Sequence, residues 1–157
     1  MSLRIANILF PTDFSDLAQG ALPFAREMAG SFQAQLHCLH VVDEAYQYWS
    51  AMGPESIPVS PPIDDMIDLA TSRMAKFREE HLDGLDRPPT THVASGRPFS
   101  EIIAYVRAQE MDLIVMATHG RGAFASMLLG STTEKVVRKA PCAVLTIRPE
   151  EHKFVMP

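Results

Sequence analysis

Residues 112–117 read DLIVMA, and this short apolar run, with a charged residue at its start and turn residues after it, predicts a buried β-strand. Four further runs have the same character, although the third of them is less apolar than the rest. They are Arg4–Pro11, Gln35–Val42, Thr90–Ala94 and Ala143–Ile147.

Between the predicted strands, apolar side chains recur at the spacing of three and four residues that is typical of an amphipathic helix. For the first helix, from Leu17 to Met28, Ser15 is the expected N-cap and Gly30 the residue just past the end. Pro141 is expected to end the last helix. The four expected helices cover about residues 17–28, 63–81, 98–109 and 132–139.

This strict alternation of strands and helices predicts an α/β fold of the Rossmann type, with a parallel sheet, right-handed crossovers and helices on both faces. We expect residues 1–157 to form one domain with a long, proline-rich loop at about residues 43–62. Its aromatic residues Tyr46, Tyr48 and Trp49 either cover a ligand or a dimer edge, or belong to a mobile surface loop. Ligands of such folds lie beyond the carboxyl ends of the strands.

The composition fits an ordinary globular protein, since 46% of the 157 residues are apolar, 21% are charged and the net charge is −5. No basic run suggests nucleic acid or an anionic membrane as a partner. No apolar run approaches the ~20 residues of a membrane span, and no signal peptide is recognisable, so we expect a cytoplasmic protein. Cys38 and Cys142 lack metal-site or redox spacing and are expected to be free thiols.

Two glycine-containing turns follow the strand at 112–117. Residues 117–122 read ATHGRG, and residues 130–134 read GSTTE at the start of the last helix. Ser131 and Glu134 match the capping box S-x-x-E, and a helix start with free backbone N–H groups attracts an anion such as phosphate. The alternative is that the glycines only form a turn and that Ser131 only caps a helix.

Five segments carry a more specific pattern: Ile8–Ser15 (ILFPTDFS), His40–Asp43 (HVVD), Gly96–Ile102 (GRPFSEI), Met116–Arg121 (MATHGR) and Leu129–Thr132 (LGST). In their order and spacing the chain resembles the universal stress protein family from about Ile5 to Arg148. ATP-binding members of that family share the motif G-x2-G-x9-G-S/T. Gly120, Gly130 and Ser131 match this motif, whereas Ala117 replaces its first glycine.

The resemblance implies the adenine nucleotide α-hydrolase-like fold with strand order 3-2-1-4-5, and ATP, AMP or ADP as the ligand, with Mg²⁺ or Mn²⁺ on the phosphates. It implies that Asp13 binds the ribose or adenine and that Val41 contacts the base. The alternative for Asp13 is an N-cap role, and for His119 a structural role in the turn. The implied nucleotide-binding residues are Pro11, Thr12, Asp13, Val41, Ala117, Thr118, His119, Gly120, Arg121, Gly122, Ala123, Gly130, Ser131, Thr132 and Thr133.

Other nucleotide motifs fit less well. Residues 120–125 read GRGAFA and formally match G-x-G-x-x-A, but the following strand ends in basic Arg148 where a dinucleotide site requires an acidic residue. The P-loop motif G-x-x-x-x-G-K-S/T does not occur.

No catalytic arrangement is recognisable from the residues, so we expect a nucleotide-binding protein that is at most a slow ATPase. The alternative is a dimeric interaction protein of the same fold that binds no nucleotide. In either case an apolar edge strand at Ala143–Ile147 favours a homodimer.

Overall fold

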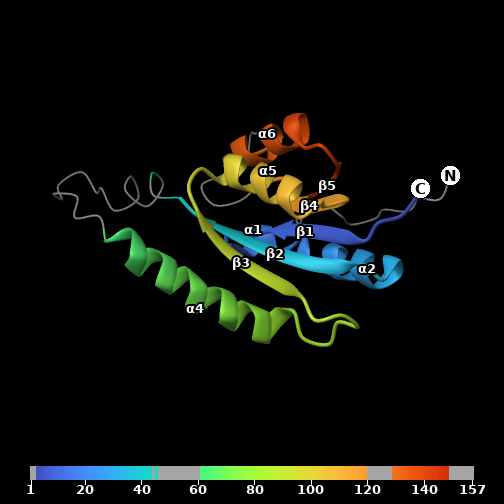
Figure 1. The fold of residues 1–157 in the computed structure, drawn as a ribbon, viewed down its shortest axis with the longest axis horizontal. Helices are drawn as coiled ribbons and strands as arrows, with labels where there is room; N and C mark the ends of the chain where they lie inside the picture. The colour runs from blue at the N-terminus through green and yellow to red at the C-terminus, as the bar shows by residue number, and fades with distance from the viewer. Residues whose placement is uncertain (1–2, 44, 46–60, 120–128, 149–157) are drawn as a thin grey trace.

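The computed structural model of the protein describes residues 3–43, 45, 61–119 and 129–148. Its strands are β1 (Asn7–Pro11), β2 (Gln35–Val42), β3 (Thr90–Ser95), β4 (Leu113–Ala117) and β5 (Ala143–Ile147). They form a parallel sheet in the order β3-β2-β1-β4-β5, so the predicted α/β fold and strand order are confirmed (Figure 1). Most of the long loop expected at 43–62, including its three aromatic residues, lies outside the described residues.

Helices cover both faces of this sheet (Figure 1). In the described part of the chain they are α1 (Asp16–Gln19), α2 (Leu22–Phe32), α4 (Ile63–His81), α5 (Pro98–Ala108) and α6 (Ser131–Lys139). The pair α5 and α6 packs on one face, and α1, α2 and α4 pack on the other.

Two main apolar clusters, and a smaller one at Val42, Met66 and Ala70, hold these layers together, and the main clusters lie on opposite faces because successive side chains of a strand point to opposite faces. On the face of α2 and α4, Ile8 and Phe10 pack with Ala25 and Phe77. On the face of α5 and α6, the strand residues Leu9, Leu39 and Ile114 pack with Ile102 and Val136. The alternation of the strands thus builds two separate cores.

The helix predicted from Leu17 to Met28 is wrong, because the segment forms two helices. Ser15 does cap the first, since its hydroxyl accepts the Ala18 N–H at 3.2 Å. Gly20 ends α1, and Pro23 lies in the first turn of α2, where proline is well tolerated. Gly30 lies within α2, not past its end.

The predicted capping box at Ser131 is also wrong. The N-cap of α6 is Gly130, with φ −66° and ψ 158°, and this residue has no side chain that could cap the helix. Glu134 instead pairs with Arg138 at 3.1 Å, one turn further along. Ser131 is therefore the first residue inside α6, and its side chain is exposed.

Asp112 joins the two central strands at their amino ends. One oxygen of its carboxylate accepts the backbone N–H groups of Ala6 at 2.7 Å and Asn7 at 2.9 Å. The Asp112 backbone N–H donates in turn to the Asn7 carbonyl at 2.9 Å. These bonds fix the register of β1 against β4, the two strands between which the strand order reverses.

Two further expectations concern cysteine and the membrane. Cys38 and Cys142 are free thiols, as predicted, and lie on strand β2 and just before β5, three strand positions apart. None of the helices in the described residues combines the length and apolar composition of a bilayer span.

Candidate functional site

The strand order reverses between β1 and β4, and the carboxyl ends of these strands are where a sheet of this type binds its ligand. Pro11 pairs with Leu39 of β2, and Ile8 pairs with Leu113 of β4. Continued to the carboxyl ends, these registers bring Asp13 level with Val41 on one side and with Thr118 on the other. Three segments that are distant in the sequence therefore meet at this edge.

The loop after β1 is held by its own side chains. The Thr12 hydroxyl oxygen accepts the Phe14 N–H at 3.0 Å. Asp13 Oδ1 accepts both the N–H of Ser15, at 2.9 Å, and its hydroxyl, at 2.5 Å. Asp13 is therefore not the N-cap itself, because Ser15 has that role and Asp13 orients it.

A buried histidine of β2, His40, also contacts the loop after β1. His40 is 8% exposed, and its Nδ1 lies 2.8 Å from the Thr12 carbonyl oxygen. Its ring stacks on Phe14 with centroids 4.4 Å apart. The hydrogen bond to Thr12 has no local sequence signal because 28 residues separate the two.

The end of β4 is joined to the start of α6 by two hydrogen bonds. The Gly130 N–H donates to the Thr118 carbonyl at 2.7 Å, and the Thr133 hydroxyl donates to the Ala117 carbonyl at 3.0 Å. A Cβ atom at Gly130 would lie 3.3 Å from the Thr118 oxygen and 3.6 Å from the His119 Cα. Close approach of two backbone segments therefore explains why this position is a glycine.

Three residues of the predicted site, Thr133, Ala117 and His119, also make structural contacts. Thr133 is 4% exposed and donates its hydroxyl proton to Ala117, so only its backbone N–H remains as a candidate phosphate donor. Ala117, which replaces the first motif glycine, packs its methyl group in the core of the α2 and α4 face. His119 Nδ1 lies 3.1 Å from the Thr118 hydroxyl, which fits a structural role in the turn.

The structure thus brings together the predicted residues that it describes. They are Pro11, Thr12, Asp13, Val41, Ala117, Thr118, His119, Gly130, Ser131, Thr132 and Thr133. Gly120, Arg121, Gly122 and Ala123 lie outside the described residues. The backbone N–H groups of the first turn of α6 have no acceptor within the helix, and they begin directly after Gly130.

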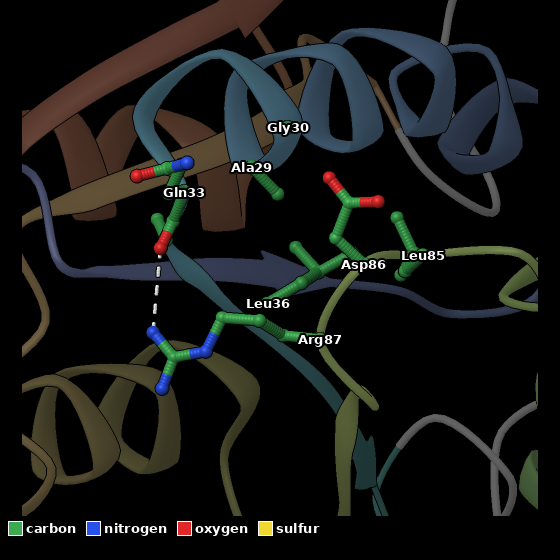
Figure 2. Close-up of a pocket in the computed structure, with 8 residues that line it drawn as sticks. Ala29, Gly30, Gln33, Leu36, Leu85, Asp86 and Arg87 are labelled. Atoms are coloured by element: carbon green, nitrogen blue, oxygen red, sulfur yellow. Dashed lines mark hydrogen bonds between the residues drawn. The ribbon is translucent and has the colours of Figure 1, made fainter.

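Other features of the described residues lie away from this edge. A pocket of about 360 Å³ lies at the amino ends of the strands, between the end of α2 and residues 85–87, where Arg87 donates to the Gln33 carbonyl at 3.3 Å (Figure 2). The candidate site lies at the opposite end of the sheet, at the carboxyl ends of the strands. In the described segments no three His, Cys, Asp or Glu side chains are grouped to hold a metal ion.

A titratable cluster lies between β2 and α5. His37 Nδ1 is 2.9 Å from the Tyr105 hydroxyl oxygen, and burial lowers the pKa of His37 and raises the pKa of Tyr105. Burial therefore favours the neutral form of both hydrogen-bonded side chains. Burial also raises the pKa of the neighbouring Cys38 thiol to about 12.

Comparison with known proteins agrees with this fold. The family model for the universal stress protein family matches residues 5–148. This chain belongs to the universal stress protein family. A universal stress protein of Thermus aquaticus is 33% identical over 144 residues, which cover 90% of this chain and 98% of the relative. The solved structure of universal stress protein UspA from Lactobacillus plantarum is 33% identical, with a TM-score of 0.76, and the match covers 94% of this chain and all of that one.

Some solved universal stress proteins contain nucleotides. One was crystallised in complex with cAMP, with 19% identity and a TM-score of 0.62 over 94% of this chain and 99% of that one. Another, from Archaeoglobus fulgidus, contains dAMP, with 17% identity and a TM-score of 0.63 over 94% of this chain and all of that one. At these identities the likeness shows the shared fold.

Proposed function

We propose that this universal stress protein binds an adenine nucleotide, with ATP as the preferred ligand, at the carboxyl ends of β1, β2 and β4. The observation that carries the proposal is the convergence of three segments at the switch point: the Asp13 loop, Val41, and the Gly130 turn bonded to Thr118. The Asp13 loop and Val41 suit the nucleoside, and the turn at Gly130 suits the phosphates.

The nucleoside is assigned to the side of β1 and β2. Asp13 offers a carboxylate on a loop that its own hydrogen bonds to Ser15 hold in one conformation. A carboxylate accepts hydrogen bonds from ribose hydroxyls or from the adenine amino group. Val41 is partly buried and lies one residue before the end of β2, so it offers an apolar surface to the base.

The phosphates are assigned to the side of β4 and α6. A protein with a net charge of −5 has no general basic field to attract a triphosphate. The backbone N–H groups at the start of α6 provide a local one, since a helix N-terminus carries partial positive charge. The residue before this helix, Gly130, lies close to Thr118 and has no side chain that would obstruct the phosphates.

The nucleotide-bound relatives support this proposal as members of the same fold. The proposed role is regulatory, as a cytoplasmic stress-response module that senses or carries the nucleotide, and any divalent cation such as Mg²⁺ or Mn²⁺ would be held mainly by the phosphates. Hydrolysis is not required for this role.

The test is to purify the protein, release any bound small molecule with acid, and identify it by chromatography. Calorimetry on the nucleotide-free protein then compares ATP, AMP and adenosine. Asp13→Asn keeps an acceptor for Ser15 but changes the second carboxylate oxygen into a donor, so it should weaken all three ligands. A protein that releases no nucleotide and binds none after extraction would be a dimeric interaction protein instead.

A further inference from the structure

We infer that His40 is a positioning residue, which holds the loop of residues 11–15 in the conformation that presents Asp13 to the nucleoside. This inference rests on the proposed function, because it assigns the internal support of the same site. It is carried by two contacts of one buried ring with the residues on either side of Asp13.

The first contact fixes the backbone before Asp13. His40 Nδ1 lies 2.8 Å from the Thr12 carbonyl oxygen, and a carbonyl only accepts, so this nitrogen carries the proton. Thr12 and His40 are both buried, at 6% and 8% exposure. Without the imidazole, the Thr12 carbonyl would lose a partner in a place that water does not easily reach.

The second contact holds the residue after Asp13 in an unfavourable backbone conformation. Phe14 has φ 63°, in the left-handed region that bulky residues rarely adopt. Its ring stacks on His40 with an interplanar angle of 29°, packs against Phe77 at 5.7 Å, and lies 5.0 Å from the Arg73 guanidinium. These contacts compensate for the strain.

Asp13 lies between the two residues that His40 contacts, so its position depends on that support. The bonds of Asp13 to Ser15 fix the carboxylate relative to helix α1. His40 instead fixes this loop relative to β2, the strand that carries Val41 at the next position. His40 therefore sets the spacing between the two groups assigned to the nucleoside.

The chain offers a matched control in His37. It lies on the same strand and is buried to the same degree, at 7% exposure. Because the two residues are three apart on a strand, they point to opposite faces, and His37 contacts Tyr105 of α5 instead of the Asp13 loop. His37→Asn tests the loss of a buried histidine without a change at the site.

Two substitutions separate the contacts of His40. His40→Phe keeps an aromatic ring against Phe14 but has no donor for Thr12, whereas His40→Asn places an amide N–H at the Nδ1 position but lacks the ring. Calorimetry measures adenosine and ATP binding, and thermal melting measures stability.

We expect His40→Phe to weaken adenosine and ATP equally, by roughly tenfold, and His40→Asn to weaken both by about threefold. His37→Asn should lower the melting temperature and leave both affinities unchanged. Unchanged adenosine affinity in a folded His40→Phe variant overturns the inference. It is also overturned if affinity simply follows melting temperature across the three variants, because that pattern indicates general stability.

Nitrogen NMR of the parent protein provides a readout that does not depend on the variants folding. The inference requires a proton on His40 Nδ1, and an Nδ1 that lacks a proton would overturn it. If the parent protein binds neither adenosine nor ATP, the proposed function fails and the role of His40 fails with it. A failure of the inference alone leaves the parent affinity intact.

Discussion

Gly130 is the position where an added side chain tests the site most sharply. Its φ of −66° and ψ of 158° are accessible to any residue, so a substitution creates no backbone strain. The new Cβ would lie 3.3 Å from the Thr118 carbonyl oxygen, which is a few tenths of an ångström closer than an ordinary contact. The 2.7 Å hydrogen bond from Gly130 to this same oxygen must then adjust.

The expected effect on stability is small for alanine and larger for valine. In Gly130→Ala, the restricted unfolded chain raises the free energy of unfolding by about 0.4–1 kcal/mol. The crowded contact with Thr118 lowers it by a similar amount. Gly130→Val adds two more carbons and should cost about 1–3 kcal/mol. The folded sheet survives both substitutions, because Gly130 precedes α6 and is not a core residue.

The expected effect on the ligand is selective. A shift of this turn moves the N–H groups at the start of α6 away from the phosphates. Loss of one hydrogen bond to a charged group costs about 1.5–3 kcal/mol, so ATP affinity should fall roughly ten- to a hundredfold in Gly130→Val. Adenosine has no phosphates and should bind as it does to the parent.

Calorimetry with ATP and adenosine, together with urea unfolding, measures both effects. Gly30→Ala is the matched control, since a Cβ at this helical position meets no atom within 4 Å; it should stabilise the protein by about 0.5–1 kcal/mol and leave binding unchanged. If folded Gly130→Val binds ATP as tightly as the parent, the phosphates do not lie at this turn.

Three further predictions concern other parts of the molecule. Because burial lowers the pKa of His37 in the folded state, the unfolded chain binds more protons, and stability should fall as the pH drops below about 6.5; a His37→Asn variant that shows the same loss between pH 7 and 5 would assign it to other groups. Cys38, buried and with its pKa raised to about 12, should resist a thiol reagent until the protein unfolds, whereas partly exposed Cys142 reacts in the native state; equal native rates would contradict this. Strand β5, Ala143–Ile147, is the last strand of the sheet that the structure describes and should pair in a homodimer; light scattering that detects only monomer at high concentration would refute it.

The sequence predicts the strands well because their signal is local. The run Leu113–Ala117 is apolar throughout and is followed by turn residues, and the structure places all five strands within a few residues of the expected ends. The first helix is predicted less well, because the apolar spacing continues across the break between α1 and α2. Gly20 and Pro23 mark that break, because glycine and proline are stronger signals of a helix boundary than apolar spacing is of continuity.

The candidate site was predictable only where a motif encodes it. The pattern at Gly130 predicts the turn correctly, but it predicts Ser131 as the N-cap, one residue too late. Helix boundaries are uncertain by a residue or two when only the sequence is known. The contacts that organise the site are long-range and have no local pattern. His40 with Thr12, and Asp112 with Ala6 and Asn7, are visible only once the sheet is assembled.

The most direct test of the proposed function is calorimetric titration of the nucleotide-free protein with ATP, followed by the same titration of Asp13→Asn. Saturable binding of ATP at one site per chain is expected, weakened roughly ten- to a hundredfold by the substitution, which keeps the acceptor for Ser15. The absence of ATP binding by the folded parent protein would contradict the account, and unchanged affinity in Asp13→Asn would remove the nucleoside from the end of β1.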